Sequence, residues 1–302
     1  MIPIRSLILI VLLMSGGAWA QDRGSLNPRP LPPLTNPNDP RLAAKELFGR
    51  ELTPAAGSAR SIGGYARGCV AGAAALPVDG EAWQVMRLSR NRNWGHPQLV
   101  AFLERFSARV PRINGWPGLL VGDMAQPRGG PMITGHASHQ IGLDADVWLT
   151  PMPGRRLTRL EREEMSATNV VRSDWLDVDP SAWTPEHQAL LKAVASERAV
   201  ARVFVNPAIK KALCGSAGAD RSWLTKIRPT YGHNYHFHIR LACPDGAAGC
   251  SDQDPPPPGD GCGADLAYWF RPEVMHPKPG PPRPPLTLAQ LPAECRSVLA
   301  AP

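Results

Sequence analysis

The sequence predicts an α+β fold, in which helices surround a central antiparallel sheet in a single domain with Pro-rich tails. In the middle of the chain, apolar residues recur at two spacings, about every 3.6 residues as in helices and every second residue as in strands. Pro residues, 34 of 302, cluster near both ends, where they predict extended linkers rather than core. We predict a signal peptide over 1–20, a Pro-rich linker over 21–55, one domain over 56–270, and a Pro-rich tail over 271–302.

The first twenty residues have the pattern of a signal peptide. Arg5 precedes an apolar run from Leu7 to Met14, and Ala18-Trp19-Ala20 forms an A-x-A-like cleavage site. The run is too short for a permanent bilayer-spanning helix, so a retained anchor is the weaker alternative. Later segments are neither long nor apolar enough to cross a membrane, and no cysteine near the cleavage site offers a lipid attachment. We therefore expect export without a membrane anchor.

Three helices are predicted in the middle of the chain. The stretch from Pro97 to Val110 repeats apolar residues at helical spacing, which predicts one amphipathic helix. A second helix is expected after Thr184, a good N-cap followed by Pro at the first turn. A third begins at Asn206-Pro207 for the same reason.

Several short strands are predicted around these helices. Arg202 to Val205 is a short apolar run typical of a buried strand, and the segments that begin at Trp83 and Gly118 have similar character. A further strand is expected from Asp144 to Trp148, and another begins at Tyr235. Together with the helices, these strands give the α+β class.

Six cysteines fit an exported protein. They are Cys69, Cys214, Cys243, Cys250, Cys262 and Cys295. No C-x-x-C pair occurs, which argues against a zinc ribbon. Three disulfides in an oxidising compartment would use all six, and fifteen connectivities remain open at this point.

The net charge is basic, which favours an anionic partner. The chain carries +7, or +6 once Arg5 is removed with the signal peptide (7 − 1 = 6). Nucleic-acid motifs are absent, so a cell-wall polymer or a membrane surface is the more suitable anionic partner. A basic surface without a specific partner is the alternative.

Five of the eight histidines fall in two short segments. The first segment, G-H-A-S-H-Q-I-G-L-D-A-D-V-W from Gly135, contains His136 and His139. The second, Y-G-H-N-Y-H-F-H-I-R-L from Tyr231, contains His233, His236 and His238. If the second segment is a strand, its alternate residues His236, His238 and Arg240 share one face. The remaining histidines are isolated and are expected at the surface: His96, His187 and His276.

The spacing of these residues predicts a metal site. A turn at Gly142 would bring His139 close to Asp146, and His238 would complete an N,O,N ligand set. Three protein ligands with one open position are typical of catalytic zinc. The helical H-E-x-x-H motif is absent. A purely structural pairing of these side chains is the alternative.

Four segments resemble the penicillin-insensitive murein endopeptidases. They are G-H-A-S-H-Q-I-G-L-D-A-D, V-G-D-M, V-N-P-A-I-K and P-P-P-P-G-D-G-C-G-A-D. That family belongs to the zinc peptidase superfamily of lysostaphin, D-Ala-D-Ala peptidases and hedgehog proteins. The H-x6-D spacing is similar to the latter two groups rather than to lysostaphin, which has H-x3-D. The resemblance covers roughly Ser58 to Cys295.

The resemblance implies roles for the histidines. Zinc would be held by His139, Asp146 and His238, with His136 as a further candidate ligand. His236 would be the general base or proton shuttle. His233 would act beside it, as a neighbour of the ligands or as a group that faces the substrate, and His136 has the same alternatives. The resemblance also implies the disulfides Cys69–Cys295, Cys214–Cys262 and Cys243–Cys250, the first of which would pin the C-terminal tail.

The sequence departs from the wider family in two places. Some relatives use a Glu as general base near the last ligand, but Tyr231 to Leu241 contains none. An extra Asp and His metal pair occurs downstream of the motif in the close family, but Val170 to Asp179 contains no His. We therefore expect a histidine base and carry over no second metal.

The function implied is zinc-dependent hydrolysis of D-alanyl–meso-diaminopimelate cross-links in the periplasm, with murein as the substrate. β-Lactams acylate serine, so they should not inhibit such an enzyme. The alternatives are a zinc D,D- or L,D-carboxypeptidase, a non-catalytic murein-binding module, and a wall protein that binds through its Pro-rich tails. The sequence leaves the oligomeric state open, including a homodimer.

Three further residues are candidates for the site. Arg240 is a candidate contact for substrate carboxylates, whereas Asp144 and Asp123 are either neighbours of the ligands or structural partners.

Overall fold

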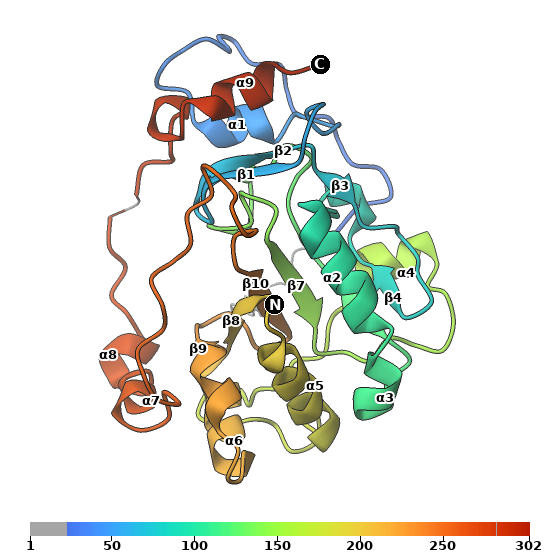
Figure 1. The fold of residues 1–302 in the computed structure, drawn as a ribbon, viewed down its shortest axis with the longest axis vertical. Coiled ribbons are helices and arrows are strands. Elements are labelled where there is room, and N and C mark those ends of the chain that lie inside the picture. Colours follow the sequence, from blue (N-terminus) through green and yellow to red (C-terminus); the bar gives the residue numbers. More distant parts are fainter. Residues whose placement is uncertain (1–22, 282) are drawn as a thin grey trace, which may run out of the picture.

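The computed structural model describes residues 23–281 and 283–302. The signal peptide predicted for residues 1–20 lies outside the described residues. Helices and strands are mixed along the described chain, and helices lie around a sheet at its centre (Figure 1). The predicted α+β class is confirmed. Among the helices of the described residues, none has both the length and the apolar character that crossing a membrane requires.

The largest sheet in the described chain has six strands in the spatial order β4-β6-β7-β10-β8-β9. Their bounds are β4 (Trp83–Val85), β6 (Leu119–Val121), β7 (Asp144–Trp148), β8 (Val200–Val205), β9 (Ile227–Pro229) and β10 (His236–Leu241). The middle four strands pair antiparallel, but β4 pairs with β6 and β8 with β9 in parallel. The sheet is thus mixed rather than purely antiparallel. The two parallel pairs are possible because helices lie between β4 and β6, and between β8 and β9, in the chain. Two parallel neighbours need such a long connection.

The two central strands, β7 and β10, are buried along their whole length and differ in chemistry between their two faces. Side chains alternate between the faces because a strand has a period of two. One face belongs to the main apolar core: Ala145, Val147, Phe237, Ile239 and Leu241. The opposite face carries Asp144, Asp146, His236, His238 and Arg240. The predicted common face of the last three residues is confirmed.

Helices pack against the apolar face of the sheet in the same core cluster. They are α2 (Pro97–Ser107), α3 (Val110–Asn114), α5 (Pro185–Ser196) and α6 (Pro207–Ser216). The single helix predicted over 97–110 ends at Ser107 instead, and a second one starts at Val110. Pro111 accounts for the break, because proline suits a first helical turn and disrupts an interior. The predicted starts of α5 and α6 are confirmed, and Asn206 Oδ1 accepts a bond from the backbone N–H of Ala208 at 2.9 Å.

His187 is buried, so its predicted surface position is wrong. Its side chain closes the N-terminus of α5, where its Nδ1 lies 3.1 Å from the backbone nitrogen of Thr184. The other ring nitrogen lies 2.9 Å from the carbonyl oxygen of Leu149. Local hydrogen bonding thus satisfies the buried ring. His96 is half-buried and caps α2, whereas His276 is exposed as predicted.

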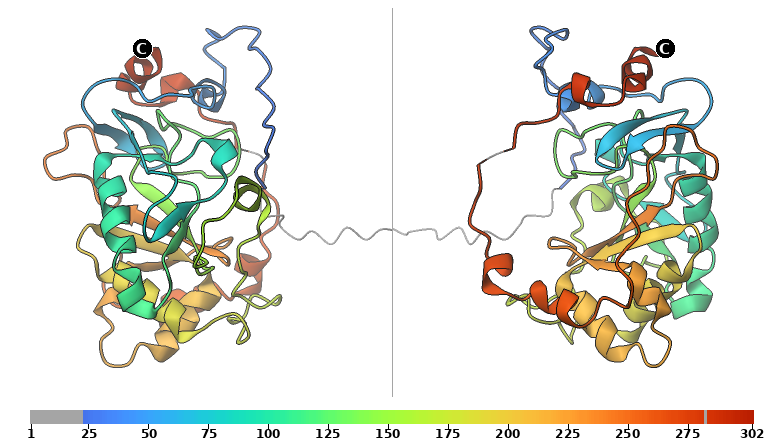
Figure 2. Two further views of the ribbon diagram at one scale, coloured as in Figure 1. Left: turned by 90° about the vertical axis from the view of Figure 1, so that its right-hand side faces the viewer. Right: turned by 60° about the vertical axis from the view of Figure 1, so that its left-hand side comes forward.

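The remaining elements are short and lie around the main sheet. They are α1 (Ala44–Phe48), β1 (Arg60–Gly64), β2 (Arg67–Ala71), β3 (Ala74–Ala75), η1 (Leu88–Arg90), β5 (Trp94–Gly95), α4 (Arg159–Glu164), η2 (Ser222–Lys226), α7 (Ala264–Tyr268), α8 (Pro272–Met275), η3 (Leu288–Gln290) and α9 (Glu294–Ala300). Figure 2 shows the Pro-rich chain between α8 and α9 running along the outside of the molecule.

All six cysteines form disulfides, with the pairing that the resemblance implied. The bonds are Cys69–Cys295, Cys214–Cys262 and Cys243–Cys250. The first joins α9 to β2 inside a small second core that also contains Phe48 of α1. Arg128 reinforces this junction by donating to three carbonyl oxygens near the C-terminus. The C-terminal helix is therefore fixed to the start of the folded chain, whereas the domain boundaries remain a prediction.

Candidate metal centre

The loop before β7 folds the first histidine segment back onto the strand. Gly142 has a φ of +72°, and a Cβ there would lie 2.7 Å from the backbone nitrogen of His96, so only glycine fits this turn. His139 also has a positive φ, +66°, which is uncommon for a residue with a side chain. Its backbone N–H donates to Asp144 Oδ2 at 2.9 Å, and this bond stabilises the turn. The predicted turn at Gly142 is confirmed.

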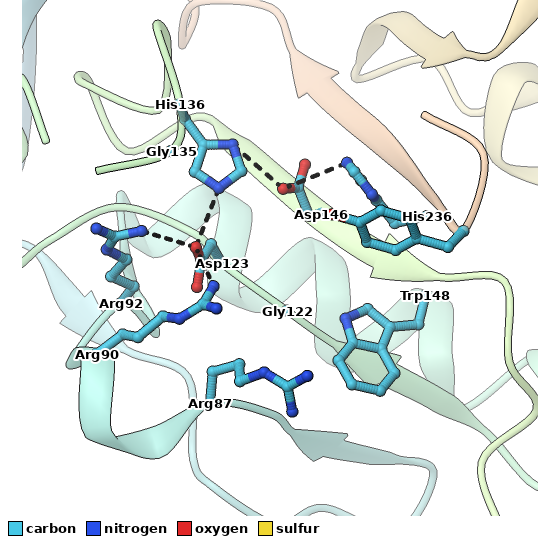
Figure 3. Close-up of a pocket in the computed structure, with 11 residues that line it drawn as sticks. Arg87, Arg90, Arg92, Gly122, Asp123, Gly135, His136, Asp146, Trp148 and His236 are labelled. Carbon is cyan, nitrogen blue, oxygen red and sulfur yellow. Dashed lines mark hydrogen bonds and ion pairs between the residues drawn. The ribbon is translucent and has the colours of Figure 1, made fainter. Parts of the chain in front are cut away.

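Asp146 lies at the centre of the polar face, and four imidazoles converge on its carboxylate. His139 Nε2 and His238 Nδ1 each lie 3.4 Å from Oδ1. His136 Nδ1 lies 3.4 Å from Oδ2. His236 Nε2 is slightly farther from Oδ2, at 3.6 Å. Figure 3 shows His136 and His236 on opposite sides of this carboxylate. The structure thus brings together all four residues predicted as metal ligands, and the predicted base beside them.

These distances fit a bound metal ion. Two ligand atoms that are each about 2.1 Å from a tetrahedral ion lie about 3.4 Å apart. The ligand atoms of His136, His139 and Asp146 all lie within 4.8 Å of one another, which makes this group able to hold a metal. His238 does not belong to that group, but its Nδ1 faces the same carboxylate.

Unsatisfied polar atoms support the same conclusion. Within the part of the chain that the structure describes, the buried ring nitrogens of His139 and Oδ1 of Asp146 have no hydrogen-bond partner. Buried polar atoms are normally paired, so such a cluster needs an explanation. A metal ion at this position would satisfy Oδ1 of Asp146 and the His139 nitrogen nearest to it, Nε2.

Burial keeps the neighbouring imidazoles neutral. It lowers the pKa of His236 to about 3, despite the opposing charge of Asp146. It also lowers the pKa of His238 to about 4, although Asp144 acts in the opposite direction. Neutral imidazole is the form that binds a metal or accepts a proton, so both histidines are in their reactive form at neutral pH.

Asp144 supports His238 from behind. Its Oδ1 lies 2.9 Å from His238 Nε2, so the other ring nitrogen points toward Asp146. Arg240 holds the same carboxylate through Nε at 2.7 Å and Nη2 at 3.1 Å. A carboxylate behind a ligand histidine fixes the ring orientation. Of the two roles left open for Asp144, the structure favours that of a partner to His238, a candidate ligand.

Arg240 does not have the role expected from the sequence. It was a candidate contact for substrate carboxylates, but it is buried and bound to Asp144. Its guanidinium carbon also lies 4.1 Å from the ring centroid of Tyr65 and 5.0 Å from that of Phe204. The arginine is enclosed because β10 is a central strand, and its neighbours cover it on both sides.

Asp123 supports His136 in a similar way. Its Oδ2 lies 3.0 Å from His136 Nε2, which directs Nδ1 of that ring toward Asp146. Arg90 and Arg92 bind the same oxygen at 3.0 and 2.9 Å. Burial alone would raise the pKa of Asp123, but the bond from His136 and the two arginines hold it well below its usual range. This carboxylate is therefore ionised and fixes the position of His136.

His233 lies beside the centre rather than in it. Its Nδ1 is 3.2 Å from the carbonyl oxygen of Tyr231, and its ring centroid is 4.8 Å from that of His236. Burial lowers its pKa, so this imidazole is also neutral at pH 7. The residue flanks His236 from the loop that leads into β10.

A pocket that the sequence interpretation missed opens next to the centre (Figure 3). Asp123, His136, Asp146 and His236 are among the residues that line it. The lining also includes the arginines of the stretch R-L-S-R-N-R, namely Arg87, Arg90 and Arg92. The signal in the sequence was three arginines within six residues, the first of them at the end of a predicted strand. Their closeness to Asp146 depends on the parallel pairing of β4 with β6, which the sequence does not reveal.

A family model described as penicillin-insensitive murein endopeptidase matches residues 61–300. The chain belongs to this family. A relative from Yersinia enterocolitica, named penicillin-insensitive murein endopeptidase, is 47% identical over 246 residues, which cover 82% of this chain and 87% of the relative. Proteins of the same name from Klebsiella pneumoniae and Citrobacter koseri are 48% and 47% identical over 248 and 247 residues, or 82% of this chain and 88% of each relative. The predicted family resemblance is confirmed.

Proposed function

We propose that this protein is a zinc-dependent murein endopeptidase that hydrolyses the bond between D-alanine and meso-diaminopimelate in peptidoglycan cross-links. Membership of the family supports peptidoglycan as the substrate and peptide hydrolysis as the reaction. The observation that carries the proposal is the convergence of three imidazoles on Asp146 at 3.4 Å. A catalytic zinc centre needs three protein ligands and one open position, and two of these imidazoles together with the carboxylate can supply the three ligands.

The residues that would hold zinc are His139, Asp146 and His238, and His136 is a further candidate ligand. Imidazole nitrogens with one carboxylate oxygen form a donor set that suits zinc. When bound, zinc supplies Lewis-acid polarisation of the scissile carbonyl and of the attacking water. The protein contributes the fixed directions of the rings, through Asp144 behind His238 and Asp123 behind His136.

His236 is the proposed general base. It lines the pocket beside Asp146 and is 7% exposed, and burial keeps its imidazole neutral. A neutral ring can take a proton from the attacking water and later give it to the leaving amine. His233, whose ring lies beside that of His236, is proposed as the second catalytic histidine, which contacts the substrate or passes the proton onward.

The proposed location of the protein is the periplasm. The signal peptide predicted for residues 1–20 and the three disulfides support export to an oxidising compartment. The oligomeric state, including a homodimer, stays a prediction.

The test compares two murein-derived substrates, one cross-linked and one uncross-linked. Purified mature protein should convert cross-linked muropeptide dimers to monomers, and it should leave uncross-linked pentapeptides intact. Release of D-alanine from the pentapeptides alone would replace the proposal with a carboxypeptidase. Binding of murein without cleavage of either substrate would leave a binding module.

A variant of the base separates catalysis from metal binding. His236→Gln should retain bound zinc but lose at least about 100-fold in kcat, because proton transfer contributes this much. His276→Gln, at an exposed position, is the matched control and should behave like the wild type. Full activity of His236→Gln would exclude this histidine as the base.

A further inference from the structure

The pocket beside Asp146 is lined on one side by arginines and has a volume of about 130 Å³. It shares Asp146 and His236 with the metal centre, so a ligand in the pocket lies next to the reacting bond. Figure 3 shows Arg90 and Arg92 on the side away from His236, both directed at Asp123. The chemistry of this wall determines which part of a substrate it can accept.

The backbone that carries the arginines is held in an unusual conformation. Arg87 and Asn91, at the two ends of η1, have φ values of +58° and +52°. Side chains other than glycine rarely adopt this left-handed region, and residues forced into it are concentrated at binding and catalytic sites. The Asn91 side chain supports the turn through Leu52 O at 3.1 Å and Trp94 Nε1 at 2.8 Å. The turn places Arg90 and Arg92 on the same side of the pocket.

The pocket carries a positive charge. Three arginines and two aspartates, Asp123 and Asp146, line the pocket, so these side chains sum to +1 (3 − 2 = 1) before any metal ion is counted. Arg90 and Arg92 are 18% and 9% exposed at their side chains, and both are fixed by the same oxygen of Asp123. Fixed guanidinium groups in a partly desolvated pocket favour an anionic ligand, above all a carboxylate.

The other walls leave room for such a ligand. Gly122 lines the pocket next to Trp148, and a Cβ at this glycine would lie 3.1 Å from Trp148 Nε1. Arg87 lies over the Trp148 ring and donates to the carbonyl oxygens of Arg162 and Met165. It therefore shapes the wall, whereas Arg90 and Arg92 are the arginines grouped around Asp123.

The proposed substrate has an anion in the corresponding place. In a D-alanyl–meso-diaminopimelate cross-link, the scissile nitrogen is attached to a carbon that bears a free carboxylate. We infer that Arg90 and Arg92 bind this carboxylate, and so select substrates that are acidic on the leaving-amine side. This inference rests on the proposed function, because it assumes that the scissile bond lies at the centre around Asp146.

The experiment uses two cross-linked muropeptide dimers that differ in one group. One has the free carboxylate next to the scissile nitrogen, and the other has its primary amide. The wild-type protein should cleave the free acid about 100-fold better in kcat/KM, as expected for a desolvated charge pair that loses one partner. Arg90→Gln should lower kcat/KM for the acid by a similar factor and leave the amide nearly unchanged, so that the preference disappears.

Two variants complete the test. Arg90→Lys keeps the charge but loses the forked geometry, and should retain part of the preference. Arg105→Gln, on the exposed side of α2, is the matched control and should keep the full preference. Because the readout is a ratio of two substrates, partial loss of folded protein does not affect it.

The outcomes separate this inference from the proposed function. If the wild-type protein cleaves neither dimer, the proposed function fails and the subsite fails with it. If it cleaves both equally well, the function stands and the carboxylate subsite is wrong. If Arg90→Gln retains the wild-type preference, the arginine only holds Asp123 in place, and the subsite is again wrong.

Discussion

Replacing Asp144 by Asn should weaken both the fold and the metal centre, for two separable reasons. The carboxylate is completely buried and is bound by Arg240 through two nitrogens, at 2.7 and 3.1 Å. An amide of the same shape leaves this buried guanidinium without a counter-charge. Loss of one partner from a buried ion pair costs about 3–5 kcal/mol, so the free energy of unfolding should fall by that amount.

The second effect of Asp144→Asn acts through His238. The carboxylate lies 2.9 Å from Nε2 of that ring and sets its direction toward Asp146. Removal of a supporting group of this kind lowers metal affinity by about 10–100-fold. Zinc affinity is measured by competition with a chelator, and stability by urea unfolding of the metal-free protein, so that metal loss does not contribute to it.

A double variant separates the two effects. Asp144→Asn combined with Arg240→Met removes both buried charges, and should recover most of the lost stability while zinc affinity stays low. Asp245→Asn, at an exposed position, is the control and should change neither quantity. Wild-type zinc affinity in Asp144→Asn would refute the orienting role of this carboxylate. Failure of the double variant to regain stability would refute the account of Arg240.

Three further predictions concern the buried lysine, the long disulfide and the metal. Burial, together with the charge of Arg228, lowers the pKa of Lys210 to about 7. Since the unfolded chain then binds more protons than the folded one between pH 7 and about 10, urea-measured stability should rise across this window, and Lys210→Met should flatten the rise. The Cys69–Cys295 bond spans 226 residues, so the chain-entropy relation predicts that replacing both cysteines by Ser lowers the free energy of unfolding by about 5.4 kcal/mol, and a loss below about 1 kcal/mol would contradict this argument. A chelator should abolish cleavage of muropeptide dimers and added zinc should restore it, while a β-lactam at saturating concentration should have no effect; cleavage by metal-free protein would exclude the metal mechanism.

The convergence of the candidate ligands could be predicted because much of its geometry is local. His236 and His238 share a face since they are two apart on one strand, and Gly142 marks the turn that returns His139 to Asp146. These relations need only short-range rules. The register that places His238 opposite Asp146 was not itself predictable, but few other arrangements would bring both segments to one centre.

The supporting contacts could not be predicted because they join distant parts of the chain. Arg240 and Asp144 are separated by 96 residues, and only the pairing of β10 with β7 brings them together. The position of Arg90 near Asp123 similarly depends on the parallel pairing of β4 with β6. Tertiary contacts thus decided which charged groups support the candidate ligands and which line the pocket.

The burial of isolated residues was also predicted incorrectly. His187 was expected at the surface because it is isolated in the sequence from the other histidines, yet it is buried against Trp116 and Trp183. The break of the first predicted helix near Pro111 had a local signal, which the apolar period of the preceding residues outweighed.

The most direct test of the central claim is the metal content of the protein together with its activity. Wild-type protein and His139→Ala should be analysed for zinc and assayed on cross-linked muropeptide dimers under the same conditions. The account predicts about one zinc ion per wild-type chain, conversion of dimers to monomers, and loss of both in the variant. Wild-type protein that cleaves dimers without a bound metal, or His139→Ala that keeps both zinc and activity, would contradict it.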